Sequence, residues 1–104
     1  IFQDMFDVLM KAQQAMLDTQ KKLDGMTVQH QANGVSVTVT GNRKITSITI
    51  DPATIEDGDT EQLEEVLLSV LNRALEKAET LNNTETQKVT SNMLPPGFNI
   101  PGLF

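Results

Sequence analysis

Cysteine, tryptophan and tyrosine are absent from these 104 residues, and phenylalanine supplies all of the few aromatic side chains. The lack of cysteine excludes a disulfide framework and thiolate chemistry. The single histidine, His30, leaves no Cys-His catalytic pair and no metal site built on two histidines. No apolar run approaches the length of a membrane-spanning helix. These absences argue against an enzyme and against a membrane protein, and they suit the cytoplasm.

Motifs that bind phosphate or metal are missing as well. The six glycines are scattered, and none belongs to a phosphate-binding loop. The segment Asp57-Gly58-Asp59-Thr60-Glu61 has its glycine misplaced for a calcium-binding loop, so the start of a capped helix is the favoured interpretation. We interpret His30, which shares a strand face with Met26 and Val28, as a core or interface residue. We therefore expect no catalytic residue, no cofactor and no metal.

Basic side chains are few and unevenly placed. The chain has a net charge of −6. Residues 1–50 carry five bases and four acids, a net charge of +1, whereas residues 51–104 carry three bases and ten acids, a net charge of −7. Clustered Lys and Arg bind nucleic-acid phosphates, and acids repel them. Charge alone therefore does not predict a nucleic-acid-binding protein.

Apolar residues at alternating spacings of four and three predict an amphipathic helix from about Phe2 to Asp24. Its seam consists of Met5, Leu9, Ala12, Met16, Thr19 and Leu23. Near the start of the helix the apolar residues spread around the whole circumference, which one small partner surface cannot cover. Either a second subunit covers this end or it binds another partner. Gly25 predicts the helix end, because glycine adopts a left-handed conformation without steric cost.

Alternating apolar and polar residues then predict three strands, at about 26–32, 35–40 and 44–50. Asn33-Gly34 is typical of a tight hairpin turn, since both residues tolerate positive φ, and Gly41-Asn42 marks a second turn. We expect an antiparallel three-stranded meander in which each strand has one buried face and one exposed face.

A 3.6-residue apolar stripe predicts a second helix that covers the sheet. The stripe comprises Leu63, Val66, Leu67, Val70, Leu71, Ala74, Ala78 and Leu81. Asp59 is the expected N-cap, with Gln62 at the position that completes a capping box. From Asn82 to Asn92 the chain turns polar, and a fraying helix is expected there. Residues 1–92 are thus predicted to form one α+β domain, followed by an apolar tail, residues 93–104, in which proline and glycine prevent regular structure.

Five segments in this order resemble the YbaB/EbfC family of bacterial nucleoid-associated proteins. They are Leu9–Met16, Gly34–Gly41, Ile48–Pro52, the second-helix segments Glu61–Glu65 and Asn72–Leu75, and Met93–Phe98. The resemblance covers nearly the whole chain. It implies a homodimer that binds double-stranded DNA with little sequence preference, at the nucleoid of a bacterial cytoplasm, with projecting helices that flank the DNA.

The resemblance also implies which residues contact DNA phosphates. The candidates are Lys11, Lys21 and Lys22 on the first helix, Arg43 and Lys44 at the second turn, and Arg73 and Lys77 on the second helix. Two surfaces remain open for the dimer contact, one formed by Met5, Leu9 and Met16 and the other by Val35, Val37 and Val39. The alternative function is a protein-interaction module that uses the apolar first helix and the tail, and it fits the net charge better.

Overall fold

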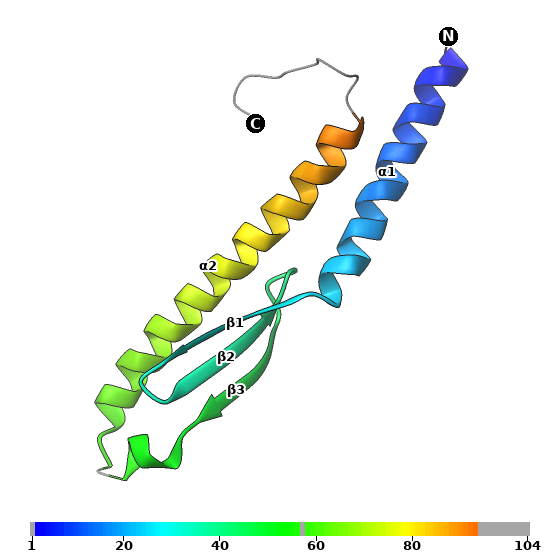
Figure 1. Ribbon diagram of the computed structural model, residues 1–104. Coiled ribbons are helices and arrows are strands. Elements are labelled where there is room, and N and C mark those ends of the chain that lie inside the picture. Colours follow the sequence, from blue (N-terminus) through cyan, green and yellow to red (C-terminus); the bar gives the residue numbers. More distant parts are fainter. Residues whose placement is uncertain (1, 57, 94–104) are drawn as a thin grey trace.

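The computed structural model of the protein describes residues 2–56 and 58–93. The elements follow the order α1 (Phe2–Asp24), β1 (Thr27–Ala32), β2 (Val35–Thr40), β3 (Ile45–Ile50), the short 3-10 helix η1 (Pro52–Ile55) and α2 (Thr60–Met93). The strands form one antiparallel sheet in the order β1-β2-β3. The predicted helix–meander–helix α+β fold is confirmed (Figure 1). The predicted apolar tail lies outside the described residues, except for Met93 at the end of α2.

The turns of the meander use the residues that the sequence marked. Asn33 and Gly34 both have positive φ, 51° and 84°, which fits the tight β1–β2 hairpin. At the β2–β3 turn the left-handed residue is Arg43, with φ of 66°. Gly25 departs from the expectation, because its φ is not positive. Instead α1 ends with a hydrogen bond that spans three residues, from the Gly25 amide to the Lys22 carbonyl, at 3.1 Å.

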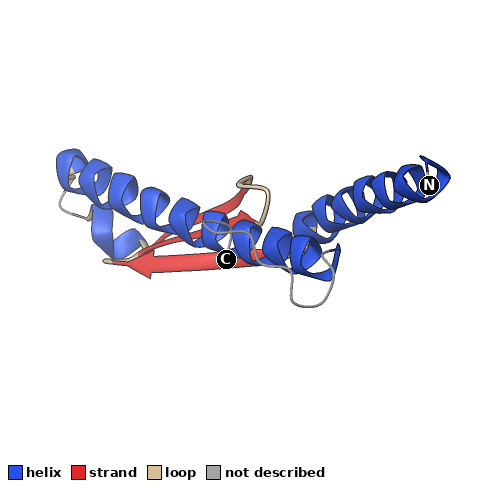
Figure 2. Ribbon diagram, turned by 90° about the horizontal axis from the view of Figure 1, so that it is seen from above, coloured by secondary structure: helices blue, strands red, loops and turns tan. Residues whose placement is uncertain are grey.

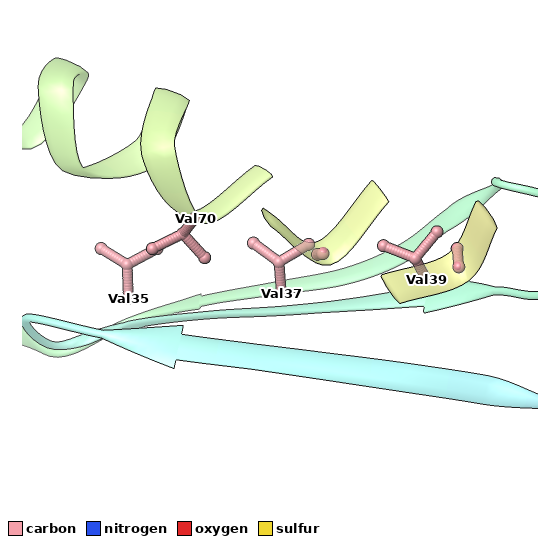
Figure 3. Close-up of a cluster of buried hydrophobic side chains, with 6 residues drawn as sticks. Val35, Val37, Val39 and Val70 are labelled. Atoms are coloured by element: carbon pink, nitrogen blue, oxygen red, sulfur yellow. The ribbon is translucent and has the colours of Figure 1, made fainter. Parts of the chain in front are cut away.

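The core lies between β2 and the first half of α2. Val35, Val37 and Val39 are 0% exposed and pack against Val70 and two alanines of α2, Ala74 and Ala78 (Figure 3). Small residues on the helix let its backbone approach the valine row closely. Helix α2 of the same chain already covers these three valines, so this surface, one of the two predicted dimer contacts, belongs to the core of the single chain.

The edge strand β3 also departs from the prediction. Its register pairs Val37 with Ile48 and Val39 with Ile45, so both isoleucines share the valine face of the sheet. A bulge in β3 opposite Thr38 and Val39 places one extra residue between Ile45 and Ile48. This explains why the two isoleucines, three residues apart, point to the same face. Yet Ile45 is 41% and Ile48 48% exposed, because α2 packs on β1 and β2 and leaves this face of β3 open.

Helix α2 begins as predicted and continues further than expected. The Asp59 carboxylate accepts a hydrogen bond from the Gln62 amide at 3.1 Å, which is one half of the predicted capping box. The polar segment 82–92, where fraying was expected, remains helical up to Met93. The first half of α2 lies along the sheet, and its second half extends past the sheet beside α1 (Figures 1 and 2).

Helix α1 is attached to the rest of the molecule only through its C-terminal half. Leu23 and Thr19 are buried, at 1% and 8% exposed. By contrast, every described side chain from Asp4 to Lys11 is exposed, including five large apolar ones. Figure 2 shows this half of the helix projecting away from the sheet. The molecule is consequently elongated, with extents of 70 × 26 × 16 Å.

Candidate nucleic-acid interface

The last turn of α1 is fastened to the β2–β3 turn by hydrogen bonds. The Asn42 side-chain amide donates to the Gln20 carbonyl at 2.9 Å and to the Asp24 carboxylate. The Gly41 amide donates to the Leu23 carbonyl at 3.1 Å. These bonds set the end of α1 against the turn between β2 and β3. Two pairs of basic residues that are distant in sequence, 21–22 and 43–44, are thereby brought to one end of the sheet.

A fifth basic residue reaches the same region from α2. Lys22 and Lys88 both donate to the carboxylate of Glu85, at 3.3 Å and 3.4 Å. We name the five bases the basic junction; they are Lys21, Lys22, Arg43, Lys44 and Lys88. The sequence did not predict Lys88. Its only local signal is the spacing of three residues from Glu85, and nothing in the sequence pairs Glu85 with a lysine of α1.

Glu85 is the one acid buried among the described residues. Its side chain is 8% exposed, whereas those of Lys22 and Lys88 are 59% and 63% exposed. Burial disfavours the charged form of the carboxyl, but the hydrogen bonds and the charges of the two lysines outweigh it and lower the pKa of Glu85. Glu85 is therefore a carboxylate at neutral pH and links α2 to α1 through Lys22.

A second basic pair lies elsewhere, where α2 crosses β1. Arg73 and Lys77 line an open groove together with the half-buried His30 and with Glu76. The ammonium group of Lys77 donates to the backbone carbonyl of Gln29 at 3.0 Å. The structure therefore separates these two predicted DNA contacts from the basic junction, and it places His30 at the rim of a groove rather than in the core.

Lys11 is also separate from the basic junction. It lies on the exposed half of α1, about 16 Å before Lys22 at the usual helical rise. Asp4 and Asp7 are also exposed on this half of the helix, so this part of α1 is not basic. Of the seven predicted DNA contacts, the structure thus gathers the four at positions 21, 22, 43 and 44.

Six of the nine described acids in the second half of the chain gather at the opposite end of the sheet. Figure 1 shows η1 and the start of α2 beside the β1–β2 hairpin, away from the end where α1 meets the sheet. The described acids in this region are Asp51, Glu56, Asp59, Glu61, Glu64 and Glu65, all exposed. The uneven charge along the sequence therefore becomes a partial separation of charge in space, since Asp24 and Glu85 still lie at the basic end.

Within the described ranges 2–56 and 58–93, no group of three or more His, Asp or Glu side chains is arranged to hold a metal ion. Neither helix, over its described residues, combines the length and apolar character needed to cross a membrane.

Basic side chains gathered at one end of the sheet are the kind of surface that binds nucleic-acid phosphates. The chain belongs to the YbaB/EbfC DNA-binding family, whose model matches residues 2–93. The family predicted from the five sequence segments is thus confirmed, and it is one of nucleoid-associated DNA-binding proteins rather than of enzymes.

Individual relatives agree with this assignment. The chain is 41% identical to a nucleoid-associated protein of Flavobacterium johnsoniae over 101 residues, which cover 95% of this chain and 91% of the relative. It is 39% identical to one of Clostridium acetobutylicum over 95 residues, or 89% of this chain and 80% of the relative. The crystal structure of an uncharacterised Helicobacter pylori protein shares the fold, with a TM-score of 0.73, 21% identity and coverage of 91% of this chain and 98% of that one.

Proposed function

We propose that the protein binds double-stranded DNA as a homodimer with low sequence specificity, without catalysis, at the nucleoid of the cytoplasm. The observation that supports this most directly is the basic junction. Five bases from α1, the β2–β3 turn and α2 converge there although the chain as a whole is acidic. Lys and Arg side chains at such a site neutralise DNA phosphates.

Low specificity follows from the kind of side chain at the basic junction. Four of its five members are lysines, which contact phosphates as point charges. Phosphate contacts fix position but carry no sequence information. We expect about 3–5 phosphates to be contacted. The logarithm of the binding constant then falls with the logarithm of the salt concentration, with a slope of about −0.9 for each contact, so the salt dependence is modest.

The separation of charge reconciles DNA binding with the net charge of −6. DNA that approaches the basic junction stays at the opposite end of the sheet from the exposed acids around η1 (Figure 1). Screening over a Debye length of roughly 8 Å at physiological salt weakens their repulsion across the length of a strand. The acids then repel DNA from the far end of the molecule and restrict it to one orientation.

Homodimerisation is supported by apolar surface that the single chain leaves uncovered. Ile45 and Ile48 on β3 form one such surface, and Leu68 of α2 is 63% exposed. Met5 and Leu9, at 62% and 66% exposed, form another on α1, with Met16 at its lower end. A second copy that covers the β3 surface buries apolar area and presents two basic junctions to one DNA duplex.

The decisive experiment is a titration of fluorescent double-stranded DNA with the protein at two salt concentrations, with the mass in solution measured by light scattering. We choose Lys21→Gln/Lys44→Gln as the test variant, because both residues belong to the basic junction and neither contacts the buried Glu85. The matched control is Lys11→Gln/Lys77→Gln, which removes the same charge elsewhere.

We expect the wild-type protein to bind as a dimer in a salt-sensitive manner. The junction variant should lose about tenfold or more in affinity at low salt, and the control should lose clearly less, because the proposal places the main phosphate contacts at the basic junction. Absence of wild-type binding at low salt would refute the proposal. Equal losses in both variants would place the DNA contact away from the basic junction.

The exposed half of α1 favours a second candidate function, a protein-interaction module. Five neighbouring apolar side chains there are each more than half exposed, which is unusual for a monomeric surface; they are Met5, Phe6, Val8, Leu9 and Met10. The variant Phe6→Gln/Leu9→Gln distinguishes the two functions. It should abolish a protein contact made through α1 while it leaves DNA binding at the basic junction unchanged.

A further inference from the structure

Lys22 and Lys88 of the basic junction are not free to meet a phosphate in the structure. Both are held by the Glu85 carboxylate, which lies between the C-terminal half of α1 and the second half of α2. The N···O distances of 3.3 Å and 3.4 Å are longer than the roughly 2.7–2.9 Å of strong charge-assisted hydrogen bonds, so both bonds are weak ones of this kind. Two of the five bases of the junction therefore share the single negative charge of an internal partner.

The burial of the three side chains is asymmetric. Glu85 is almost fully buried, at 8% exposed, so its carboxylate is fixed in place between the helices. The lysines are exposed at 59% and 63%, so their flexible side chains can swing out to solvent without exposing core. Ion pairs with an exposed partner contribute little free energy, and exchange of that partner costs little.

A phosphate group of DNA offers a lysine the same kind of partner as a carboxylate does. Both are anionic oxygens, but DNA adds the entropy of released counterions, which a buried carboxylate does not. At low salt a lysine at this site is consequently drawn from Glu85 towards DNA. At high salt the advantage of the phosphate falls, and the internal partner retains the lysine.

We propose that Glu85 is an internal competitor of DNA phosphates, which holds Lys22 and Lys88 in the free protein and yields them when the basic junction engages DNA. This inference rests on the proposed DNA-binding function. Glu85 thereby limits the affinity of the protein and makes its DNA binding less steeply dependent on salt, because fewer lysines contact phosphates on average. It also couples DNA binding to the helices, because release of Lys22 removes the ion pair between α1 and α2.

The direct test compares Glu85→Gln with Glu79→Gln in the DNA titration. Both variants remove one negative charge from α2, but Glu79 is exposed and forms no ion pair among the described residues. We expect Glu85→Gln to bind about two- to tenfold more tightly than the control at low salt. Its salt slope should be steeper than that of the control by about 0.9 for each lysine released.

A double-mutant cycle attributes the gain to the lysines. Lys88→Gln should reduce DNA affinity only slightly in the wild-type protein, because Lys88 is already paired with Glu85 there. It should cost clearly more in the Glu85→Gln background, where the lysine is free to bind phosphate. Equal costs in both backgrounds would overturn the proposal.

A measurement on the wild-type protein keeps the proposal testable even if Glu85→Gln does not fold. Lysine methylation, read residue by residue by mass spectrometry, should show Lys22 and Lys88 protected by saturating double-stranded DNA. Unchanged reactivity of both lysines, with DNA demonstrably bound, would refute the role of Glu85 alone. A wild-type protein that binds no DNA at low salt would instead refute the underlying function.

Discussion

At the scale of the single residue, Gly41 joins three elements at the basic junction. Its amide bonds the Leu23 and Met26 carbonyls, at 3.1 Å and 2.9 Å, and its carbonyl accepts from the Asn82 side chain at 2.9 Å. A β-carbon at this position would lie 2.5 Å from Leu23 Cδ2 and 3.2 Å from the Leu23 carbonyl oxygen. The backbone atom cannot yield as a flexible side chain could, so a glycine is required here for space rather than for its dihedral freedom.

We therefore expect Gly41→Ala to destabilise the protein by about 1–3 kcal/mol, the usual cost of overpacking. Urea unfolding followed by circular dichroism measures this. Gly25→Ala is the matched control at the other end of the same connection. An added β-carbon there meets nothing closer than 3.6 Å, and φ is ordinary, so little change is expected. Equal effects of the two changes would contradict the proposed contact.

At the scale of the element, the ion pair between α1 and α2 depends on an ionised Glu85. Its pKa is lowered in the folded protein from the ordinary value of 4.5. A carboxyl whose pKa is depressed by folding contributes stability above its unfolded pKa, and that contribution is lost as the pH falls through the folded pKa. The Lys22–Glu85 ion pair between the helices is thus complete at neutral pH and disappears in acid.

The thermal midpoint of the wild-type protein should accordingly fall more steeply below about pH 5, as the pH drops through the lowered pKa of Glu85, than that of Glu85→Gln. The difference between the two proteins is the informative quantity, because the other carboxyls titrate in both. Parallel curves would show that Glu85 contributes no pH-dependent stability. Circular dichroism at a series of pH values is sufficient.

Element boundaries were largely predictable because they follow from local periodicity. The seam of α1, the Asn33-Gly34 turn and the apolar stripe of α2 each encode their own element. The β3 bulge was not predictable, since residues 44–50 also fit a regular strand. Neither was the helical end of α2, where the burial of Glu85 against α1 replaces the missing apolar stripe. Long-range pairing of this kind leaves no periodic signal in either segment.

The candidate site was predictable in its residues more than in its arrangement. Four of the seven bases meet at one end of the sheet because Asn42 fastens the β2–β3 turn to α1. Lys88 was missed because its role depends on Glu85 and Lys22, 63 residues apart in the chain. The valine row of β2 reads equally well as a core or as a dimer surface, and only the position of α2 decides between them.

At the scale of the whole molecule, the open face of β3 predicts how two copies meet. Ile48→Gln should convert a dimer into a monomer with little loss of chain stability, since Ile48 is 48% exposed in the single chain. Thr49→Gln, one residue along on the opposite face, is the matched control and should remain dimeric. Light scattering over a concentration series measures this. A dimer that survives Ile48→Gln would point to the exposed seam of α1 instead.

Helix α1 is attached only through its C-terminal half, so a small rotation there moves its N-terminal end over a larger distance. Asp4 lies about 22 Å along α1 from Thr19, the first buried residue of the helix, at a rise of about 1.5 Å per residue, and the stretch from Asp4 to Lys11 is exposed throughout. A rotation of roughly 10° at its base displaces the far end by about 4 Å over that length. Such a rotation takes place about the contacts around Leu23, Gly41 and Glu85. We therefore expect an exchange of the Lys22 partner at these contacts to displace the N-terminal end of α1, where Met5 and Leu9 are exposed.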